Sequence, residues 1–230
     1  MVRSILFNSI FWSVFVVYLL LMYPIIYFSS AETTLRLSYR PLTRWMLFCL
    51  KHFAGVGYEI RGKEKVPIGQ VIIGCNHQSA WETMVFSLLL DDFAAVVKKE
   101  LLQKPIAGMF MKRLECIPVD RESPVKAIKT LLKFGKIAYD AGKSILIFPN
   151  GTRASADEHV EYKSGIFALY KTLKRPVVPV YVNSGKCWSR NSFRKSPGII
   201  TMEFKQPILP GLDKDEFFEQ FERNMGIERK

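Results

Sequence analysis

The pattern of apolar and polar positions divides the chain into an apolar amino-terminal segment and a longer body of alternating pattern. The run Ile5–Phe28 is apolar apart from Asn8, Ser9 and Ser13. At about 1.5 Å per residue, a helix of this length reaches roughly 36 Å, which is enough to cross a bilayer. The pattern therefore predicts a membrane helix at the amino terminus.

A cleaved signal peptide is the alternative interpretation of this segment, because Ser29-Ser30-Ala31 offers small residues at a cleavage position. A signal peptide normally has a shorter apolar region, of about 7 to 15 residues. One basic residue, Arg3, precedes the run, and four follow it: Arg36, Arg40, Arg44 and Lys51. The positive-inside rule then predicts that the body of the protein faces the cytoplasm.

The stretch after Pro41 predicts an amphipathic helix on the membrane surface. Its apolar members are Leu42, Trp45, Met46, Leu47, Phe48, Leu50 and Phe53. Pro41 suits the first position of a helix. The apolar side chains would enter the acyl boundary, and Arg36, Arg40 and Arg44, which recur every four residues, would meet lipid phosphates. An ordinary amphipathic helix packed on the protein core is the alternative.

Short β-rich runs alternate with helical patterns through the rest of the chain. The predicted strands are Tyr58–Arg61, Val71–Cys75, Ala94–Val97, Cys116–Val119, Ser144–Phe148, Val177–Val182 and Ile199–Phe204. The predicted helices are Ala80–Leu90, Pro105–Met111, Pro124–Tyr139, Ser164–Leu173 and Asp213–Asn224. This alternation predicts an α/β fold with a largely buried mixed sheet of about seven strands flanked by helices. We expect a membrane-anchoring helical segment at 1–54 and a single α/β domain at 55–230.

The charge balance indicates an anionic partner. The chain has 33 Lys and Arg against 21 Asp and Glu, a net charge of +12. Nucleic acid, a phosphorylated substrate or acidic lipid would each fit that charge. The apolar fraction of 49%, with 13% aromatic residues, favours a protein partly solvated by lipid. No recognisable nucleic-acid-binding motif is present, so we expect membrane and phosphate partners and no nucleic acid.

The four cysteines predict reduced, buried thiols rather than a disulfide framework or a structural metal site. Cys49, Cys75, Cys116 and Cys187 are widely spaced, with no Cys-x-x-Cys pair and no histidine at zinc-site spacing. A disulfide or a structural metal is the alternative. We expect no bound metal.

His77 follows the apolar strand Val71–Cys75 and comes just before a predicted helix that begins near Ala80. The carboxyl ends of strands in open α/β sheets are where ligands bind. Glu82 follows five residues later and could accept one imidazole N–H, which would fix the tautomer and leave the other nitrogen as a general base. Two alternatives stay open. Ser79 to Glu82 fits a helix capping box, and His77 could be a structural histidine.

Three other strands end in basic residues. Ser144–Phe148 breaks into the turn Pro149–Arg153, Cys116–Val119 is followed by Asp120 and Arg121, and Ala94–Val97 is followed by Lys98 and Lys99. Guanidinium and ammonium groups gathered at one edge of a sheet would suit a dianionic phosphate. Solvated surface charge is the alternative for each of them.

Together these motifs resemble those of the glycerolipid acyltransferases, in particular the bacterial 1-acyl-sn-glycerol-3-phosphate type. Asn76–Glu82 resembles the family's His-x4-Asp motif, and Phe148–Arg153 resembles its Phe-Pro-Glu-Gly-Thr-Arg motif. The segments Ile117–Arg121, Val177–Val180 and Lys98–Leu101 are similar to its other motifs. The resemblance covers most of the chain after Gly55 and follows the family's motif order. Two positions depart from it, namely Glu82 in place of Asp and Asn150 in place of Glu.

The resemblance implies transfer of a fatty-acyl group to the sn-2 hydroxyl of lysophosphatidic acid, with His77 and Glu82 as the catalytic pair. It implies substrate binding by seven residues: Lys98, Lys99, Arg121, Asn150, Gly151, Thr152 and Arg153. The donor would be acyl-CoA or acyl-ACP (acyl carrier protein), a co-substrate, with no other cofactor. We expect an inner-membrane protein in contact with membrane lipids, and oxyanion donors among backbone amides near the strand-to-helix turn or the Gly151 turn. A different lysolipid acceptor, or a non-catalytic lipid-binding protein, is the alternative.

Overall fold

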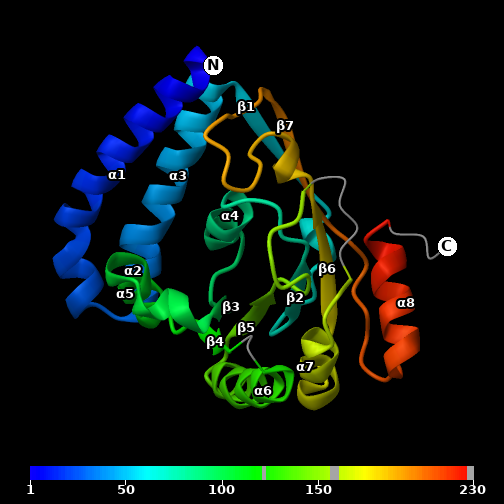
Figure 1. The fold of residues 1–230 in the computed structure, drawn as a ribbon. Coiled ribbons are helices and arrows are strands. Elements are labelled where there is room, and N and C mark those ends of the chain that lie inside the picture. The colour runs from blue at the N-terminus through cyan, green and yellow to red at the C-terminus, as the bar shows by residue number, and fades with distance from the viewer. Residues whose placement is uncertain (121–122, 156–160, 227–230) are drawn as a thin grey trace.

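Seven strands form one mixed sheet at the centre of the molecule (Figure 1). The structure, a computed structural model, describes residues 1–120, 123–155 and 161–226. In sheet order the strands are β1 (Val56–Arg61), β7 (Gly198–Phe204), β6 (Val177–Val182), β2 (Ile72–Cys75), β5 (Ser144–Ile147), β3 (Phe93–Lys98) and β4 (Ile117–Val119). The predicted mixed α/β sheet is therefore confirmed.

Five neighbouring strands of the sheet run parallel. β6, β2, β5, β3 and β4 lie side by side in this order, whereas β7 is antiparallel to β6 and parallel to β1. Parallel strands end at the same edge of a sheet. The residues that follow β6, β2, β5, β3 and β4 are therefore displayed in that order along one carboxyl edge.

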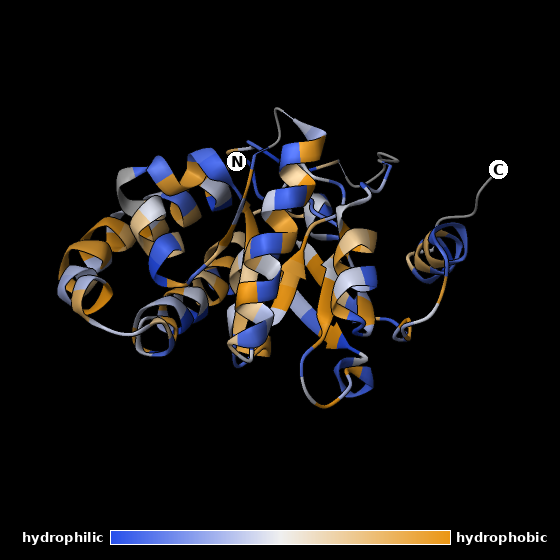
Figure 2. Cartoon of the chain, turned by 90° about the horizontal axis from the view of Figure 1, so that it is seen from below, coloured by the Kyte–Doolittle hydropathy of each residue, from blue (hydrophilic) through white to orange (hydrophobic). Residues whose placement is uncertain are grey.

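Helices cover both faces of the sheet and enclose a core on each side. One face is covered by α1 (Val2–Phe28), α3 (Arg40–Cys49) and α4 (Trp81–Leu89). The other is covered by α6 (Pro124–Asp140), α7 (Gly165–Leu173) and α8 (Lys214–Asn224). Successive residues of β2 point to opposite cores, Ile73 and Cys75 to the first and Ile72 to the second. The central strands are accordingly apolar on both faces, as their orange colour in Figure 2 shows.

Gly74 in β2 permits close packing of the second helix layer. A Cβ at this position would lie 2.5 Å from Cδ1 of Ile166 in α7 and 2.8 Å from Cε2 of Phe221 in α8. Neither distance is compatible with a side chain. The glycine brings two helices close to the strand that carries His77.

The helix predicted to begin at Pro41 is part of a longer helical run. Four segments follow one another without a break: α2 (Ala31–Thr34), the π-helical turn Leu35–Tyr39, α3 and the π-helical turn Leu50–Ala54. Pro41 is the second residue of α3 and lies in its first turn, close to the predicted position, but the helical run as a whole begins earlier, at Ala31. The π turn before the proline accommodates the missing backbone N–H.

Much of the apolar face of this helix is buried in the protein. Leu42, Met46, Leu47 and Leu50 are at most 8% exposed and belong to the core. The Arg40 guanidinium donates to the carbonyls of Ser87 and Leu90 at the end of α4 and pairs with Asp91 at 3.3 Å. These four side chains therefore pack on the core, as the alternative of an ordinary amphipathic helix predicts, whereas Phe48 on the same helix is 47% exposed.

The amino-terminal helix α1 combines a buried stripe with a broad exposed apolar surface. Its buried residues include Phe7, Phe11 and Ile26, and it contacts α3 and α5 (Pro105–Arg113) along its length. Arg113 donates to the last-turn carbonyls of Ile26 and Tyr27. On the other side, Val16, Leu20 and Leu21 are 56%, 72% and 67% exposed.

By length and composition α1 could cross a membrane. These features associate the protein with a membrane, as predicted.

Candidate active site

The imidazole of His77 is held by a buried carboxylate. His77 follows β2 at the carboxyl edge, and Glu82 lies in the first turn of α4, where it is fully buried. The Nδ1 atom of His77 lies 2.8 Å from Oε1 of Glu82. A proton on Nδ1, donated to this carboxylate, leaves Nε2 as the nitrogen that can accept a proton.

Both oxygens of Glu82 receive further hydrogen bonds. The backbone amides of Gln78 and Ser79 each donate to Oε1 at 2.7 Å. Oε2 lies 2.8 Å from Oγ of Ser79 and 2.7 Å from Oγ of Ser184, which donates to it. These contacts fix the carboxylate in one orientation, and with it the plane and the tautomer of the His77 ring.

The same contacts set the charge of the carboxylate. Burial alone would raise the pKa of Glu82, but hydrogen bonds from His77, Ser184 and Ser79 outweigh burial and lower the pKa below its usual value. The group is therefore ionised at neutral pH in a site that excludes water. A buried negative charge beside the ring stabilises the imidazolium that forms when Nε2 takes a proton.

The capping-box alternative describes part of the role of Glu82. The Ser79 amide donates to Glu82, as in a capping box, but Oγ of Ser79 accepts from the amide of Trp81 at 3.0 Å instead of capping the Glu82 amide. The helix is capped at Ala80, without a side-chain bond. The Glu82 carboxylate thus accepts hydrogen bonds from the loop before α4 and also orients His77.

The loop that carries His77 is fastened to the end of β6. Asn76 exchanges two hydrogen bonds with the backbone of Val182, at 2.8 and 2.7 Å, and Oε1 of Gln78 accepts from the amide of Gly185 at 2.9 Å. These bonds bring the Ser184 hydroxyl to Glu82. Sequence reasoning missed Ser184, because the adjacency of β6 and β2 is a property of strand order.

Residues after β5 cover the other side of the histidine. The ring of Phe148 stacks on the His77 ring, with centroids 4.3 Å apart and planes inclined by 25°. The amide of Ala154 donates to the carbonyl of His77 at 2.8 Å. The structure therefore brings together two of the sequence motifs, the His77 loop and the segment Phe148–Arg153.

The remaining residues of that segment form a turn beside the histidine. Asn150 is buried, and Gly151 has a φ of 72°, a conformation that favours glycine. Thr152 is exposed and Arg153 is partly exposed. Arg190, from the loop between β6 and β7, donates to Oγ1 of Thr152 at 3.3 Å and to the Arg153 carbonyl at 3.2 Å. The guanidinium of Arg190 therefore lies at the turn that carries Arg153, and Arg190 was not predicted.

The predicted lysines lie farther along the same edge. Lys98 ends β3 and pairs with Glu100 at 3.7 Å, and Lys99 pairs with Asp120 at 3.6 Å. In sheet order β3 is two steps from β2, or about 10 Å at the usual strand spacing. Arg121 lies outside the described residues.

The expected oxyanion donors are not found among three of the candidate amides. Gln78 and Ser79 donate their N–H groups to Glu82, and Gly151 donates to the Phe148 carbonyl at 2.9 Å. These three N–H groups already close the turns that carry them, so the prediction of an oxyanion donor rests on the other amides of the two turns.

Within residues 1–120, 123–155 and 161–226, no group of three His, Cys, Asp or Glu side chains gathers as metal ligands would. The four cysteines are free thiols. Cys49, Cys75 and Cys187 are buried, and Cys116 is partly exposed.

Comparison with known proteins identifies the family. The family model described as Acyltransferase matches residues 57–183. A 1-acyl-sn-glycerol-3-phosphate acyltransferase of Pseudomonas aeruginosa is 35% identical over 157 residues, which is 68% of this chain and 61% of that protein. One of Bacillus subtilis is 36% identical over 157 residues, 66% of this chain and 74% of that protein.

A solved structure shares the fold. The crystal structure of the 1-acyl-sn-glycerophosphate acyltransferase PlsC from Thermotoga maritima aligns with a TM-score of 0.78 at 18% sequence identity. The alignment covers 97% of this chain and 94% of that one. The family model spans more than half of the chain, and the Bacillus relative is matched over 74% of its length, so the chain belongs to the acyltransferase family.

Proposed function

We propose that the protein transfers a fatty-acyl group from a thioester donor to the sn-2 hydroxyl of 1-acyl-sn-glycerol 3-phosphate, giving phosphatidic acid. The observation that carries the proposal is the His77–Glu82 pair, a base oriented by a buried, ionised carboxylate. The names of the relatives supply the acceptor.

The chemistry follows from the free position of the imidazole nitrogen. Nε2 of His77 takes the proton of the sn-2 hydroxyl while that oxygen attacks the thioester carbonyl. The carbon–sulfur bond breaks, and the thiolate leaves and recovers the proton from the imidazolium. Glu82 keeps its negative charge throughout and stabilises the imidazolium. The products are phosphatidic acid and the free carrier thiol.

The acceptor phosphate is assigned to the basic residues of the carboxyl edge. In 1-acylglycerol 3-phosphate about four bonds, roughly 5 Å, separate the reacting oxygen from phosphorus. Arg153 follows β5, the strand next to β2, so it is the basic residue best placed for a phosphate at that distance. Lys98 and Arg121 are assigned the same phosphate by charge and by resemblance. Asn150, Gly151 and Thr152 shape the turn that presents Arg153.

The location of the protein is part of the proposal. An apolar α1 packed on the domain keeps the active site near the lipid phase, where a lysolipid acceptor resides. The excess of basic residues after this helix supports an inner-membrane protein whose domain faces the cytoplasm.

The experiment is carrier-thiol release by detergent-solubilised protein given acyl-CoA or acyl-ACP, with and without lysophosphatidic acid. We expect release that depends on the acceptor. Other lysophospholipids, supplied in competition, test the acceptor assignment. A faster reaction with another lysolipid would replace the proposed acceptor, and no release with any donor and acceptor pair would contradict the proposal.

A further inference from the structure

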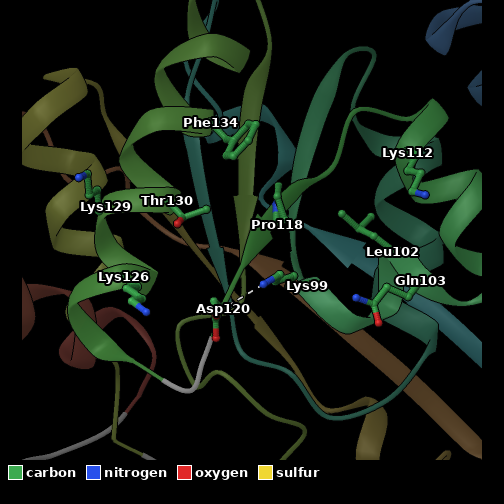
Figure 3. A pocket seen from close by; sticks show the side chains of 10 residues that line it. All are labelled: Lys99, Leu102, Gln103, Lys112, Pro118, Asp120, Lys126, Lys129, Thr130 and Phe134. Atoms are coloured by element: carbon green, nitrogen blue, oxygen red, sulfur yellow. Dashed lines mark ion pairs between the residues drawn. The ribbon is translucent and has the colours of Figure 1, made fainter.

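A groove lined by lysines opens between α6 and the helical turn η4 (Lys99–Gln103), with α5 at its far side (Figure 3). It is a cavity of about 470 Å³. Its charged lining consists of Lys99, Lys112, Lys126, Lys129 and Asp120. The ammonium groups of Lys99, Lys112 and Lys126 outnumber the single carboxylate of Asp120 and leave the groove positive.

The positive groups lie over an apolar floor. Leu102, Pro118 and Phe134 line the groove between the lysines. In Figure 3 the amino groups of Lys99 and Lys126 lie on either side of Asp120, Lys112 lies across the groove on α5, and the Lys129 side chain is directed away. Such a lining fits a slender ligand that carries an anionic group on an apolar body.

The groove lies at a defined distance from the base. Pro118 in β4 and Asp120 just after it belong to the groove, and β4 is three strand steps from β2. At the usual strand spacing this separates the groove from His77 by about 14 Å. The acceptor phosphate lies much nearer the base, roughly 5 Å from the reacting oxygen.

The donor has an anionic group at the right distance. In a phosphopantetheine thioester, about thirteen bonds separate phosphorus from sulfur, which is roughly 15 Å at the spacing of an extended chain. Coenzyme A and acyl carrier protein both carry their acyl groups on this arm. A phosphate in the groove would therefore place the thioester at His77.

We propose that this groove binds the phosphate end of the phosphopantetheine arm of the acyl donor, through Lys99, Lys112 and Lys126. The inference rests on the proposed acyl transfer. The start of α6, a 17-residue helix whose first turn carries Lys126, adds its positive dipole end to the same place. Lys99 is thereby assigned to the donor, and Lys98 remains with the acceptor.

The test compares two double variants with the wild type. Lys112→Ala with Lys126→Ala removes two groove cations. The matched control, Lys171→Ala with Lys214→Ala, removes two exposed lysines from α7 and α8. We expect the groove variant to raise the donor KM about ten-fold, with kcat and the acceptor KM unchanged, because two charge-assisted contacts to phosphate are lost. The control should match the wild type.

A competitive inhibitor shows whether the groove binds the phosphopantetheine arm or another part of the donor. Free 4′-phosphopantetheine should inhibit the wild type competitively against the donor and more strongly than pantetheine, which lacks the phosphate. This difference should disappear in the groove variant. Calorimetric titration of the wild type with 4′-phosphopantetheine gives a readout that is independent of turnover. Absence of transfer by the wild type would refute the proposed function, and it would be seen before any variant is compared.

Several results would overturn the inference. An increase in the acceptor KM instead of the donor KM would assign the groove to the acceptor phosphate. If the enzyme uses both donors, an increase in the donor KM with acyl-CoA alone would assign the lysines to the nucleotide. An increase in the donor KM with acyl-ACP alone would assign them to the carrier protein surface. An unchanged donor KM with undiminished inhibition by 4′-phosphopantetheine would place the phosphate elsewhere.

Discussion

The two ends of the carboxyl edge hold charge in opposite ways. At the β6–β2 end, Glu82 is fully buried, and the five atoms that bond to its oxygens all lie within 2.8 Å. At the β3–β4 end, the side chains of Lys98 and Lys99 are 48% and 57% exposed, and their carboxylate partners lie 3.7 and 3.6 Å away.

The difference matches two different tasks. A general base acts through one atom in one direction, so its carboxylate needs a rigid, dry environment. A phosphate site needs mobile cations whose present ion pairs are weak enough to exchange for the ligand. Substitutions at the first end should therefore lower kcat, and substitutions at the second should raise a KM.

The largest effect is expected at the carboxylate itself. Glu82→Gln keeps the size of the side chain but removes its charge and puts a donor where the hydroxyls and amides also donate. We expect kcat to fall by about 10²- to 10⁴-fold, because the imidazolium loses its counter-charge. Glu82→Asp, the more usual family residue, should retain more activity than Glu82→Gln. Equal activity of Glu82→Gln and the wild type in the thiol-release assay would show that the charge of Glu82 is not needed for turnover.

A smaller loss of kcat is expected from Ser184, which donates a hydrogen bond to the Glu82 carboxylate. Ser184→Ala removes the hydroxyl that donates to Oε2 of Glu82 at 2.7 Å, and we expect kcat to fall about ten-fold with little change in either KM. The control is Ser87→Ala, because Ser87 is also fully buried and its hydroxyl contacts Thr43 at 3.1 Å instead of Glu82. If both variants lost the same activity, Ser184 would be a packing residue only.

Substitutions of the basic residues Lys98 and Arg153 should change the acceptor KM. Lys98→Ala and Arg153→Ala should each raise the acceptor KM about five-fold and leave kcat within about two-fold, since each removes one charge-assisted contact to phosphate. Added salt should weaken acceptor binding in the wild type more than in the variants. An unchanged acceptor KM in both variants would remove these residues from the phosphate site.

The smallest effect is on the pH dependence of stability, and it comes from the buried residue Lys195. Lys195 is 4% exposed, with Nζ 4.9 Å from the Trp188 ring centroid, and burial lowers the pKa of its ammonium to about 8. Between pH 8 and about 10.4 the unfolded chain binds more protons than the folded chain, so stability should rise with pH in this window. Water screening keeps the slope below about 1.4 kcal/mol per pH unit.

Melting temperatures measured from pH 7.5 to 10 test the sign of this effect. The rise in melting temperature should be reduced in Lys195→Met relative to the wild type. A wild-type melting temperature that falls across the window as steeply as that of the variant would show that Lys195 titrates as an exposed lysine does.

Sequence alone predicted the elements and the contact between His77 and Glu82, because both are local. Val177–Val182 is apolar throughout, as a strand buried on both faces must be, and Glu82 lies five residues from its partner. Strand order is set by distant pairings, such as β1 with β7, so the approach of Ser184 and Arg190 to the site was not predictable. The apolar face of the helix after Pro41 did not by itself distinguish the protein core from a lipid surface as the partner that buries it.

We propose that His77, held by Glu82, is the general base of acyl transfer. The most direct test is mass-spectrometric detection of phosphatidic acid formed by purified wild-type and His77→Ala protein at saturating donor and acceptor, with both melting temperatures measured. We expect the rate to be about 10²- to 10⁴-fold lower in the variant, at an unchanged melting temperature. Wild-type product formation by folded His77→Ala protein would contradict it.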